Sequence, residues 1–338
     1  MRTIHKLVFE DARQMSLNPK SVNLVVTSPP YPLIQMWDKL FSEQNSCIQY
    51  ALEKEDENAT FELMHCELDK VWSALYTALK EGGIACINIG DATRSLGKVF
   101  RLYPNHARVL SACTKIGFHV LPGILWQKQS NKPNKFMGSG MLPVGAYPTL
   151  EHEHILVLRK GGPRTFKTAL EKMNRQKSAF FWEERNIWFS DVWTGLKGDR
   201  QDLNHLGLRL RSAAFPFELA YRLINMFSVQ GDIVLDPYLG TGTTMLAAMA
   251  TGRNSIGIEI DPLFKEVIRQ RTEGFVNFAN DYTQQRIAQH ILFAKTRAMG
   301  YQNENYHFPV MTKQERKIQF LILQKLTAQD DHFVVDYS

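Results

Sequence analysis

The 338-residue sequence contains only four cysteines, and none of them forms a CxxC pair. Cys47, Cys66, Cys86 and Cys113 are widely spaced, so we expect reduced thiols rather than disulfide bonds or a cysteine-based zinc site. The chain also lacks a run of 18 apolar residues and an amino-terminal signal segment. These absences predict a soluble cytoplasmic protein with no membrane partner.

The composition does not indicate a disordered chain. Hydrophobic residues make up 44% of the sequence, charged residues 22% and aromatic residues 11%, which allows a sizeable core. The net charge of +6 and the pI of about 9.0 fit a polyanionic partner, but a modest positive balance also serves solubility. The position of the charges is therefore more informative than their total.

The pentapeptide Thr27-Ser28-Pro29-Pro30-Tyr31 follows an apolar run, Val22 to Val26, that predicts a buried strand. Open α/β sheets bind ligands just past the carboxyl ends of such strands. Because proline has no N–H and keeps the preceding residue extended, the Ser28 hydroxyl and the Pro29 carbonyl are acceptors that can hold an amine. The Tyr31 ring can stack on a base. The alternative is a strand that simply ends in a proline-rich turn.

A second motif, Asp236-Pro237-Tyr238-Leu239-Gly240-Thr241-Gly242-Thr243-Thr244, lies between a predicted strand (233–235) and a predicted helix (245–250). A strand, a glycine turn and a helix are typical of a nucleotide-side pocket. The motif lacks the third glycine of GxGxxG and the lysine of a Walker loop, which argues against a dinucleotide or a nucleoside triphosphate. Glu259 ends the next predicted strand, where a carboxylate can accept hydrogen bonds from both ribose hydroxyls.

Together, these stretches resemble the amino-methyltransferases, which transfer a methyl group from S-adenosylmethionine to the exocyclic nitrogen of a DNA base. TSPPY is similar to the catalytic motif IV of that family, and DPYLGTGTT is similar to the cofactor motif I. The catalytic motif comes first, which is the circularly permuted order of the β class. Ser28 before Pro-Pro-Tyr resembles the cytosine-N4 branch, whose members belong to restriction-modification systems. The resemblance extends over residues 5–272.

The resemblance implies a Rossmann-like, doubly wound and mostly parallel α/β sheet, with double-stranded DNA as the substrate and a cognate restriction endonuclease as a possible functional partner. It implies catalytic roles for Ser28, Pro29, Pro30 and Tyr31. It implies cofactor contacts from Asp11, Phe215, Asp236, Pro237, Leu239, Gly240, Gly242, Thr243, Thr244 and Glu259. For Asp11 the alternative role is a helix cap, and for Phe215 it is core packing.

The mechanism that follows is a direct attack of the amine on the sulfonium methyl group. No metal and no covalent enzyme intermediate are required. None of the cysteines follows a proline, so the chain does not resemble the class that attacks cytosine with a Pro-Cys thiolate. Two alternatives remain open, an adenine-N6 methyltransferase and a non-catalytic DNA-binding protein with the same fold.

We divide the chain into a catalytic half (1–158), a target-recognition region (159–211), a cofactor-binding half (212–272) and a carboxyl-terminal extension of unknown role (273–338). Residues 159–211 hold 12 Lys and Arg against 6 Asp and Glu, interleaved with aromatic residues. We therefore expect DNA contacts from Arg175, Lys177 and Arg185. Lys132 and Lys135, in the long loop 127–150, are further candidates.

Three local expectations concern structure. Residues 32–59 have weak periodicity and are interpreted as an insertion near the active face. An apolar stripe from Phe61 to Leu79 predicts a helix ended by Gly82-Gly83. Residues 313–327 are expected to be helical. His152 and His154 alternate on one strand without a third ligand in view, so no metal site is predicted.

Overall fold

The structure, a computed structural model, describes residues 1–96, 99–128, 137–196 and 215–338. Its centre is a ten-stranded sheet in the order β10-β6-β9-β3-β2-β11-β12-β1-β16-β15. The strands are β1 (Arg2–Phe9), β2 (Val22–Thr27), β3 (Leu79–Ile89), β6 (Phe118–Gln127), β9 (His152–Lys160), β10 (Val192–Trp193), β11 (Ile233–Asp236), β12 (Asn254–Glu259), β15 (Leu323–Ala328) and β16 (His332–Tyr337).

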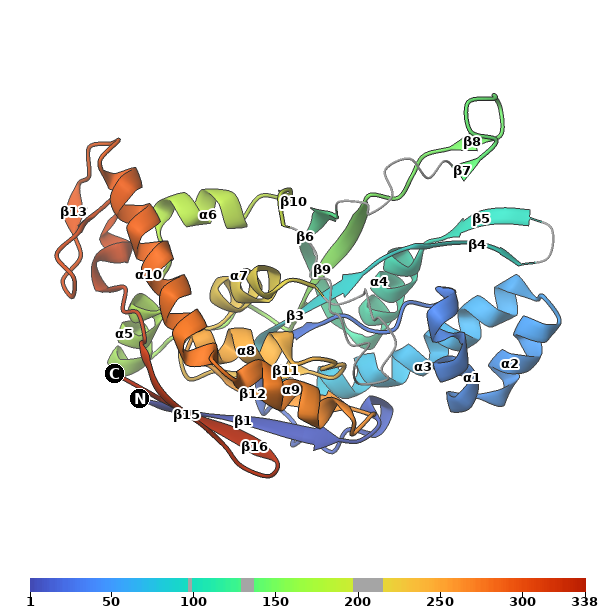
Figure 1. Cartoon of the computed structure of the whole chain (residues 1–338), viewed down its shortest axis with the longest axis horizontal. Coiled ribbons are helices and arrows are strands. Elements are labelled where there is room, and N and C mark those ends of the chain that lie inside the picture. Colours follow the sequence, from blue (N-terminus) through green and yellow to red (C-terminus); the bar gives the residue numbers. More distant parts are fainter. Residues whose placement is uncertain (97–98, 129–136, 197–214) are drawn as a thin grey trace.

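Helices cover both faces of this sheet, as the sequence predicted (Figure 1). One core cluster contains side chains of α7 (Phe217–Phe227), α8 (Thr243–Ala250), α9 (Phe264–Thr272) and α10 (Phe275–Ala294). The other contains side chains of α1 (Asp38–Gln44), α2 (Ser46–Glu53), α3 (Glu57–Ala78) and α4 (Asn105–Ile116). The fold is therefore the Rossmann-like α/β architecture.

The buried side chains of β2 pack into both core clusters, which shows why this strand lies at the centre. Leu24 and Val26 belong to one core cluster, whereas Val22 and Val25 belong to the other. All four are at most 1% exposed. A strand that is apolar on both faces must be covered on both, and this is typical of parallel sheets. The neighbouring strands β3 and β11 run parallel to β2, so their carboxyl ends meet at one edge.

The edges of the sheet are antiparallel or mixed. β9 runs antiparallel to both β3 and β6 on one side, and β16 runs antiparallel to β1 on the other. Two short hairpins, β4 (Ala92–Leu96) with β5 (Val99–Tyr103) and β7 (Met137–Gly138) with β8 (Ala146–Tyr147), project beyond β3 and β6 (Figure 1). Phe100 and Tyr147 stack at 5.2 Å between ring centroids, so the hairpins touch.

The predicted helix over 61–79 begins and ends earlier than expected. Asp56 caps it by accepting a hydrogen bond from the Ala59 N–H, and α3 ends at Ala78. Leu79 is already in β3, where it pairs with Val22, so Gly82 and Gly83 lie in the strand rather than at a helix end. Burial of Leu79 between neighbouring strands outweighs its place in the helical stripe.

The expected helix over 313–327 was wrong. Only Lys313–Lys317 form a short 3-10 helix, η4, in which Thr312 and Glu315 make a reciprocal capping box. The chain then enters β15, which pairs with β16. Leu323 of β15 is 2% exposed in the core, so sheet pairing and burial decide its conformation.

The carboxyl-terminal extension is part of the same body. Its β15–β16 hairpin lengthens the sheet at β1, and its helix α10 crosses one face (Figure 1). The Arg286 guanidinium of α10 makes two hydrogen bonds to the Glu184 carboxylate of α6 (Trp182–Trp188). The extension therefore holds the described part of region 159–211 against the core. No helix of the described chain is long and apolar enough to cross a membrane.

Candidate active site

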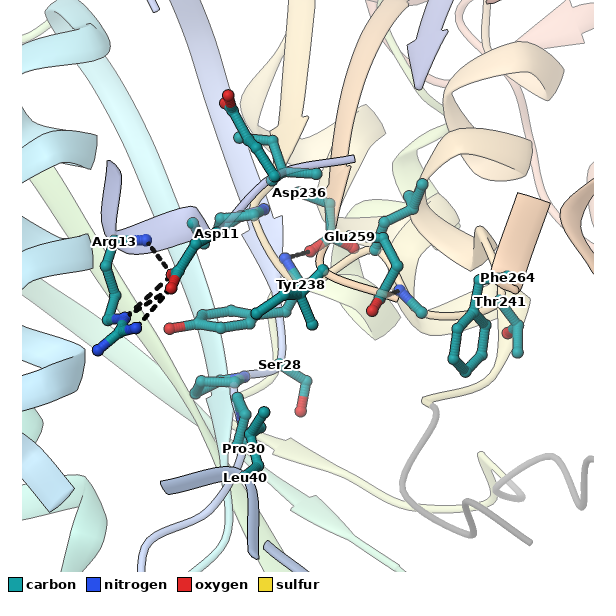
Figure 2. A pocket seen from close by; sticks show the side chains of 18 of the residues that line it. Asp11, Arg13, Ser28, Pro30, Leu40, Asp236, Tyr238, Thr241, Glu259 and Phe264 are labelled. Carbon is teal, nitrogen blue, oxygen red and sulfur yellow. Dashed lines mark hydrogen bonds and ion pairs between the residues drawn. The ribbon is translucent and has the colours of Figure 1, made fainter. Parts of the chain in front are cut away.

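A pocket of about 1020 Å³, part of which is open to solvent, lies where the strands β1, β2, β11 and β12 end. Figure 2 shows Asp11 and Arg13 at one end of it, Thr241 and Phe264 at the other, and Ser28, Pro30 and Leu40 along a third side. Each parallel strand delivers one of the predicted segments to this edge. Motifs 200 residues apart in the sequence thus face a common space.

Asp236 connects the two motifs. Its carboxylate accepts hydrogen bonds from the Thr27 hydroxyl at 2.7 Å, from the Thr244 hydroxyl at 2.7 Å and from the Tyr238 N–H at 3.1 Å. Burial raises the pKa of Asp236 to about 6, although the three donors lower it. The residue lines the pocket, but protein donors already occupy its oxygens, so its main contribution is to fix segment 27–31, the predicted catalytic segment, beside the glycine turn.

Glu259 also lines the pocket and is 6% exposed. One carboxylate oxygen accepts the Gly240 N–H at 2.8 Å, and the other accepts the Asp261 N–H at 3.1 Å. A carboxylate oxygen has more than one lone pair, so a carboxylate can accept several hydrogen bonds. The backbone contacts hold the carboxylate in one orientation before any ligand arrives.

Asp11 has the capping role that the sequence offered as the alternative, and its predicted cofactor contact stays a prediction. It lines the pocket and also caps η1 (Ala12–Gln14) by accepting the Arg13 N–H at 2.9 Å. Its carboxylate further pairs with the Arg13 guanidinium at 2.6 Å. Burial alone would raise the pKa of Asp11, but the hydrogen bonds and charge of Arg13 outweigh it and lower the pKa.

Ser28 and Tyr31 are linked by their hydroxyl groups, whose oxygens lie 3.0 Å apart. Ser28 is half-buried and lines the pocket, whereas Tyr31 is 8% exposed and is not among the lining residues. The Tyr31 hydroxyl also contacts Asn88 at 2.8 Å and Glu153 at 2.9 Å. Burial, followed by the Glu153 charge, raises the pKa of Tyr31 well above its usual value. The predicted stacking of this ring on a base stays a prediction.

Most of the predicted site residues meet at this pocket. The lining includes Ser28, Pro29, Pro30, Asp11, Phe215, Asp236, Pro237, Leu239, Gly240, Thr243 and Glu259. Gly242 and Thr244 are not among the lining residues. Gly242 has φ of 83° at the start of α8, and an added Cβ there would approach Ile268 to 3.3 Å. Thr244 acts through Asp236.

The three described residues among the predicted DNA contacts do not line the pocket. Arg175 and Lys177 are in the last turn of α5 (Ala169–Lys177), which docks on the loop before β11 through a 2.8 Å hydrogen bond from the Asn174 side chain to the Gln230 carbonyl. This is the amino edge of the sheet. Arg185 is exposed on α6 and lies over the Phe189 ring. Lys132 and Lys135 lie outside the described residues.

A second, open groove follows the amino edge. It is lined by the starts of β3 and β6, the end of β9, α5 and the end of α7. Five cations line it, namely Arg159, Arg164, Lys172, Arg175 and Lys313, and the described lining contains no Asp or Glu. Arg164 pairs with Asp232, and Arg164 and Arg175 both lie over the Phe166 ring.

The structure brings two further groups to His154. Within the described residues, Asp91, His106 and His154 place ligand-type atoms within 4.8 Å of one another. His106 Nδ1 donates to Asp91 Oδ2 at 2.8 Å. Burial, followed by the charge of His106, lowers the pKa of His154 to about 4. The two imidazole rings stack at 3.9 Å with 14° between their planes. A metal ion lies near the plane of each imidazole it binds, at about 2.0 Å, so this stacked pair is poorly arranged for shared coordination.

Sequence reasoning missed part of the pocket and of its support. Trp37, Leu40 and Gln44 line the pocket from the segment that lacked clear periodicity. Glu153 and Asn88, which contact Tyr31, belong to otherwise apolar strands and were not singled out by any sequence motif. A buried polar residue in an apolar strand is the signal that could have identified them, because such a group needs partners.

The fold and the pocket define the class of Rossmann-like methyltransferases that use S-adenosylmethionine. Residues 22–271 match the profile of the N6/N4-type DNA methylases. The chain belongs to this DNA methylase family.

Curated relatives resemble nearly the whole chain. The type II methyltransferase M.MthZI of Methanothermobacter thermautotrophicus is 55% identical over 320 residues, which cover 94% of this chain and 90% of the relative. The type II methyltransferase M.MjaI of Methanocaldococcus jannaschii is 50% identical over 281 residues, which cover 80% of this chain and 91% of the relative.

Solved structures agree on the fold. A putative DNA modification methylase from Thermus thermophilus, complexed with S-adenosyl-L-methionine, has a TM-score of 0.61 at 31% identity and covers 81% of this chain and 93% of its own. The cytosine-N4-specific PvuII DNA methyltransferase has a TM-score of 0.53 at 18% identity and covers 81% of this chain and 90% of its own. At that identity the second likeness concerns the fold alone.

The methyl donor of this family is S-adenosylmethionine, and the pocket fits it chemically. A nucleoside needs an acceptor for its ribose and apolar surfaces for its base. Glu259 offers the acceptor, and the walls include Leu239, Phe264 and Phe215. Ser28 and Pro30 border the same space, so a methyl donor bound there lies beside the predicted catalytic segment 27–31.

Proposed function

We propose that the chain is a type II modification methyltransferase that methylates the exocyclic N4 of a flipped-out cytosine in double-stranded DNA. The observation that carries the proposal is the position of Ser28, which belongs to the predicted catalytic segment 27–31 and also lines the cofactor pocket. The two curated relatives named as type II methyltransferases support the restriction-modification setting.

The catalytic segment is shaped to accept the two N–H bonds of an amine. An exocyclic amine is a weak nucleophile because its lone pair is delocalised into the ring. Two acceptors, the Ser28 hydroxyl and the Pro29 carbonyl, favour a pyramidal nitrogen whose lone pair points at the methyl donor. Bound S-adenosylmethionine supplies an electrophilic methyl group. Orientation and electrostatic stabilisation by these fixed acceptors then account for much of the acceleration.

Serine rather than aspartate at position 28 supports cytosine over adenine, on the resemblance to the cytosine-N4 branch. The motif order supports the permuted β class. DNA contacts are proposed for Arg175, Lys177 and Arg185 in region 159–211 and for Lys132 and Lys135. A cognate endonuclease would be a functional partner that cuts the same unmethylated site.

The identity of the methylated base is tested by analysing the methylated nucleoside that the reaction yields. DNA incubated with the protein and methyl-labelled S-adenosylmethionine, then digested to nucleosides, should yield label in N4-methylcytosine by mass spectrometry. Label in N6-methyladenine would show that adenine is the substrate, and label at C5 of cytosine would contradict the direct mechanism. The Ser28→Ala variant controls for contaminating activity.

A further inference from the structure

A hydrogen-bonded chain leads from Ser28 away from the pocket. The Ser28 and Tyr31 oxygens lie 3.0 Å apart, and the Tyr31 hydroxyl donates to Glu153 Oε2 at 2.9 Å. Asn88 Nδ2 donates to the same Tyr31 oxygen at 2.8 Å and to Glu153 Oε2 at 2.6 Å. Lys128 Nζ closes the chain with an ion pair to Glu153 Oε1 at 2.8 Å.

This hydrogen-bonded network is assembled from four segments that are distant in the sequence. Tyr31 follows β2, Asn88 is in β3, Lys128 follows β6, and Glu153 is the second residue of β9. Gly90 leaves room for it, since an added Cβ there would approach Tyr31 to 2.9 Å and Glu153 to 3.4 Å. Tyr31 is 8% exposed and Glu153 9%, so water competes little for these groups. Such close packing of buried polar groups fixes their orientation.

The direction of each hydrogen bond follows from the carboxylate. The Glu153 carboxylate forms an ion pair with Lys128, and a carboxylate group accepts hydrogen bonds. Tyr31 must therefore donate its single proton to Glu153. The Tyr31 oxygen, which also accepts from Asn88, can then only accept from Ser28. The Ser28 proton points at Tyr31, and both Ser28 lone pairs remain for another donor.

We propose that Glu153 is a positioning residue that, through Tyr31, makes Ser28 a hydrogen-bond acceptor toward the target amine. This inference rests on the proposed amine methylation but holds for cytosine or adenine alike. If Glu153 did not accept the Tyr31 proton, the Tyr31 hydroxyl could donate to Ser28, and the Ser28 proton would then point toward the amine hydrogens. The hydrogen bonds from Ser28 to Tyr31 and from Tyr31 to Glu153 thus select one of two orientations of the Ser28 hydroxyl. Only in that orientation can the Ser28 oxygen accept a hydrogen bond from an N–H group of the amine.

The test compares single-turnover methylation rates of Glu153→Gln, Tyr31→Phe and the double variant. Glutamine fills the same volume but can donate to Tyr31, so we expect the rate to fall at least tenfold while the affinities for DNA and S-adenosylmethionine change less than threefold. Tyr31→Phe should lose a similar factor. Because Glu153 acts only through Tyr31, the double variant should be no slower than Tyr31→Phe.

Several outcomes would overturn the inference. These are a Glu153→Gln rate within twofold of wild type, a Tyr31→Phe rate within twofold of wild type, and multiplicative losses in the double variant. A space-filling role predicts near-normal Glu153→Gln activity with a lowered melting temperature, which thermal denaturation measures. Glu151→Gln, at an exposed position two residues away, is the matched control. Wild-type product analysis tests the proposed function separately, since it does not involve these variants.

Discussion

The two edges of the central sheet differ in how their polar groups are held. At the carboxyl edge, Asp236, Glu259 and Ser28 all have short hydrogen bonds within the protein before any ligand binds. At the amino edge, Arg175 is exposed and contacts the Phe166 ring, and Lys172 is exposed on the same helix. The first arrangement suits chemistry, which requires fixed geometry, and the second suits electrostatic attraction, which tolerates motion.

The largest expected effect is at the carboxyl edge. Ser28→Ala removes the acceptor proposed for the target amine and should lower the single-turnover methylation rate on the order of 10²-fold, by analogy with the loss of one fixed hydrogen bond to a transition state. Affinity for S-adenosylmethionine should stay near wild type. Rapid-quench measurement of labelled DNA gives the rate, with Ser73→Ala, exposed on α3, as the control. An unchanged rate would remove Ser28 from the chemistry.

Sequence alone predicted the carboxyl edge more completely than the amino edge. Motif residues such as Ser28 and Gly240 follow predicted strands, and the ends of parallel strands must meet, so a shared pocket was predictable. The hydrogen-bond partners of Tyr31 could not be predicted from the sequence. Asn88 and Glu153 carry no motif, and their convergence depends on the register between β3 and β9.

The helix bounds show the same limit. The capping residue Asp56 and the apolar stripe of α3 are local signals, and the helix was predicted. Its end at Ala78 depends on Leu79 pairing with Val22, a contact across 57 residues of sequence. Likewise Leu323 enters a strand because β16 is available beside it. Long-range pairing overrides local propensity in both places.

The buried carboxylate of Asp236 should make stability depend on pH. Its pKa is raised to about 6 in the folded protein, from 3.8. A carboxyl group with a raised folded pKa adds stability below its unfolded pKa, and this contribution is lost as pH rises through about 6. The free energy of unfolding of wild type relative to Asp236→Asn should therefore fall between pH 4 and pH 7, by up to about 3 kcal/mol.

Urea denaturation at pH 4, 5, 6 and 7 measures this difference. Asp281→Asn, on an exposed position of α10, should leave the pH dependence of wild type unchanged. A constant difference between wild type and Asp236→Asn across this range would show that Asp236 titrates alike in the folded and unfolded states.

Glu259 should matter for the cofactor and little for DNA. Glu259→Ala removes a charged acceptor from the pocket wall, which should weaken S-adenosylmethionine binding by about 2 kcal/mol, or roughly 30-fold. Isothermal titration calorimetry measures it, with Glu273→Ala, exposed after α9, as the control. Wild-type affinity in a folded Glu259→Ala protein would place the ribose contact elsewhere.

The smallest expected effect tests whether DNA reaches the amino edge at all. Replacing Arg175, Lys177 and Arg185 with Glu should weaken DNA binding roughly tenfold at 0.1 M salt and flatten its salt dependence, because each lost phosphate contact lowers the logarithmic slope by about one. Cofactor affinity should not change, since none of the three residues lines the pocket. Reversing Lys6, Lys115 and Lys325, which are exposed elsewhere, changes the net charge equally and controls for a general effect. If both triple variants lose the same affinity, the net charge rather than region 159–211 attracts DNA. If neither loses any, DNA contacts only the carboxyl edge, and the two hairpins beyond β3 and β6 become the next surface to alter.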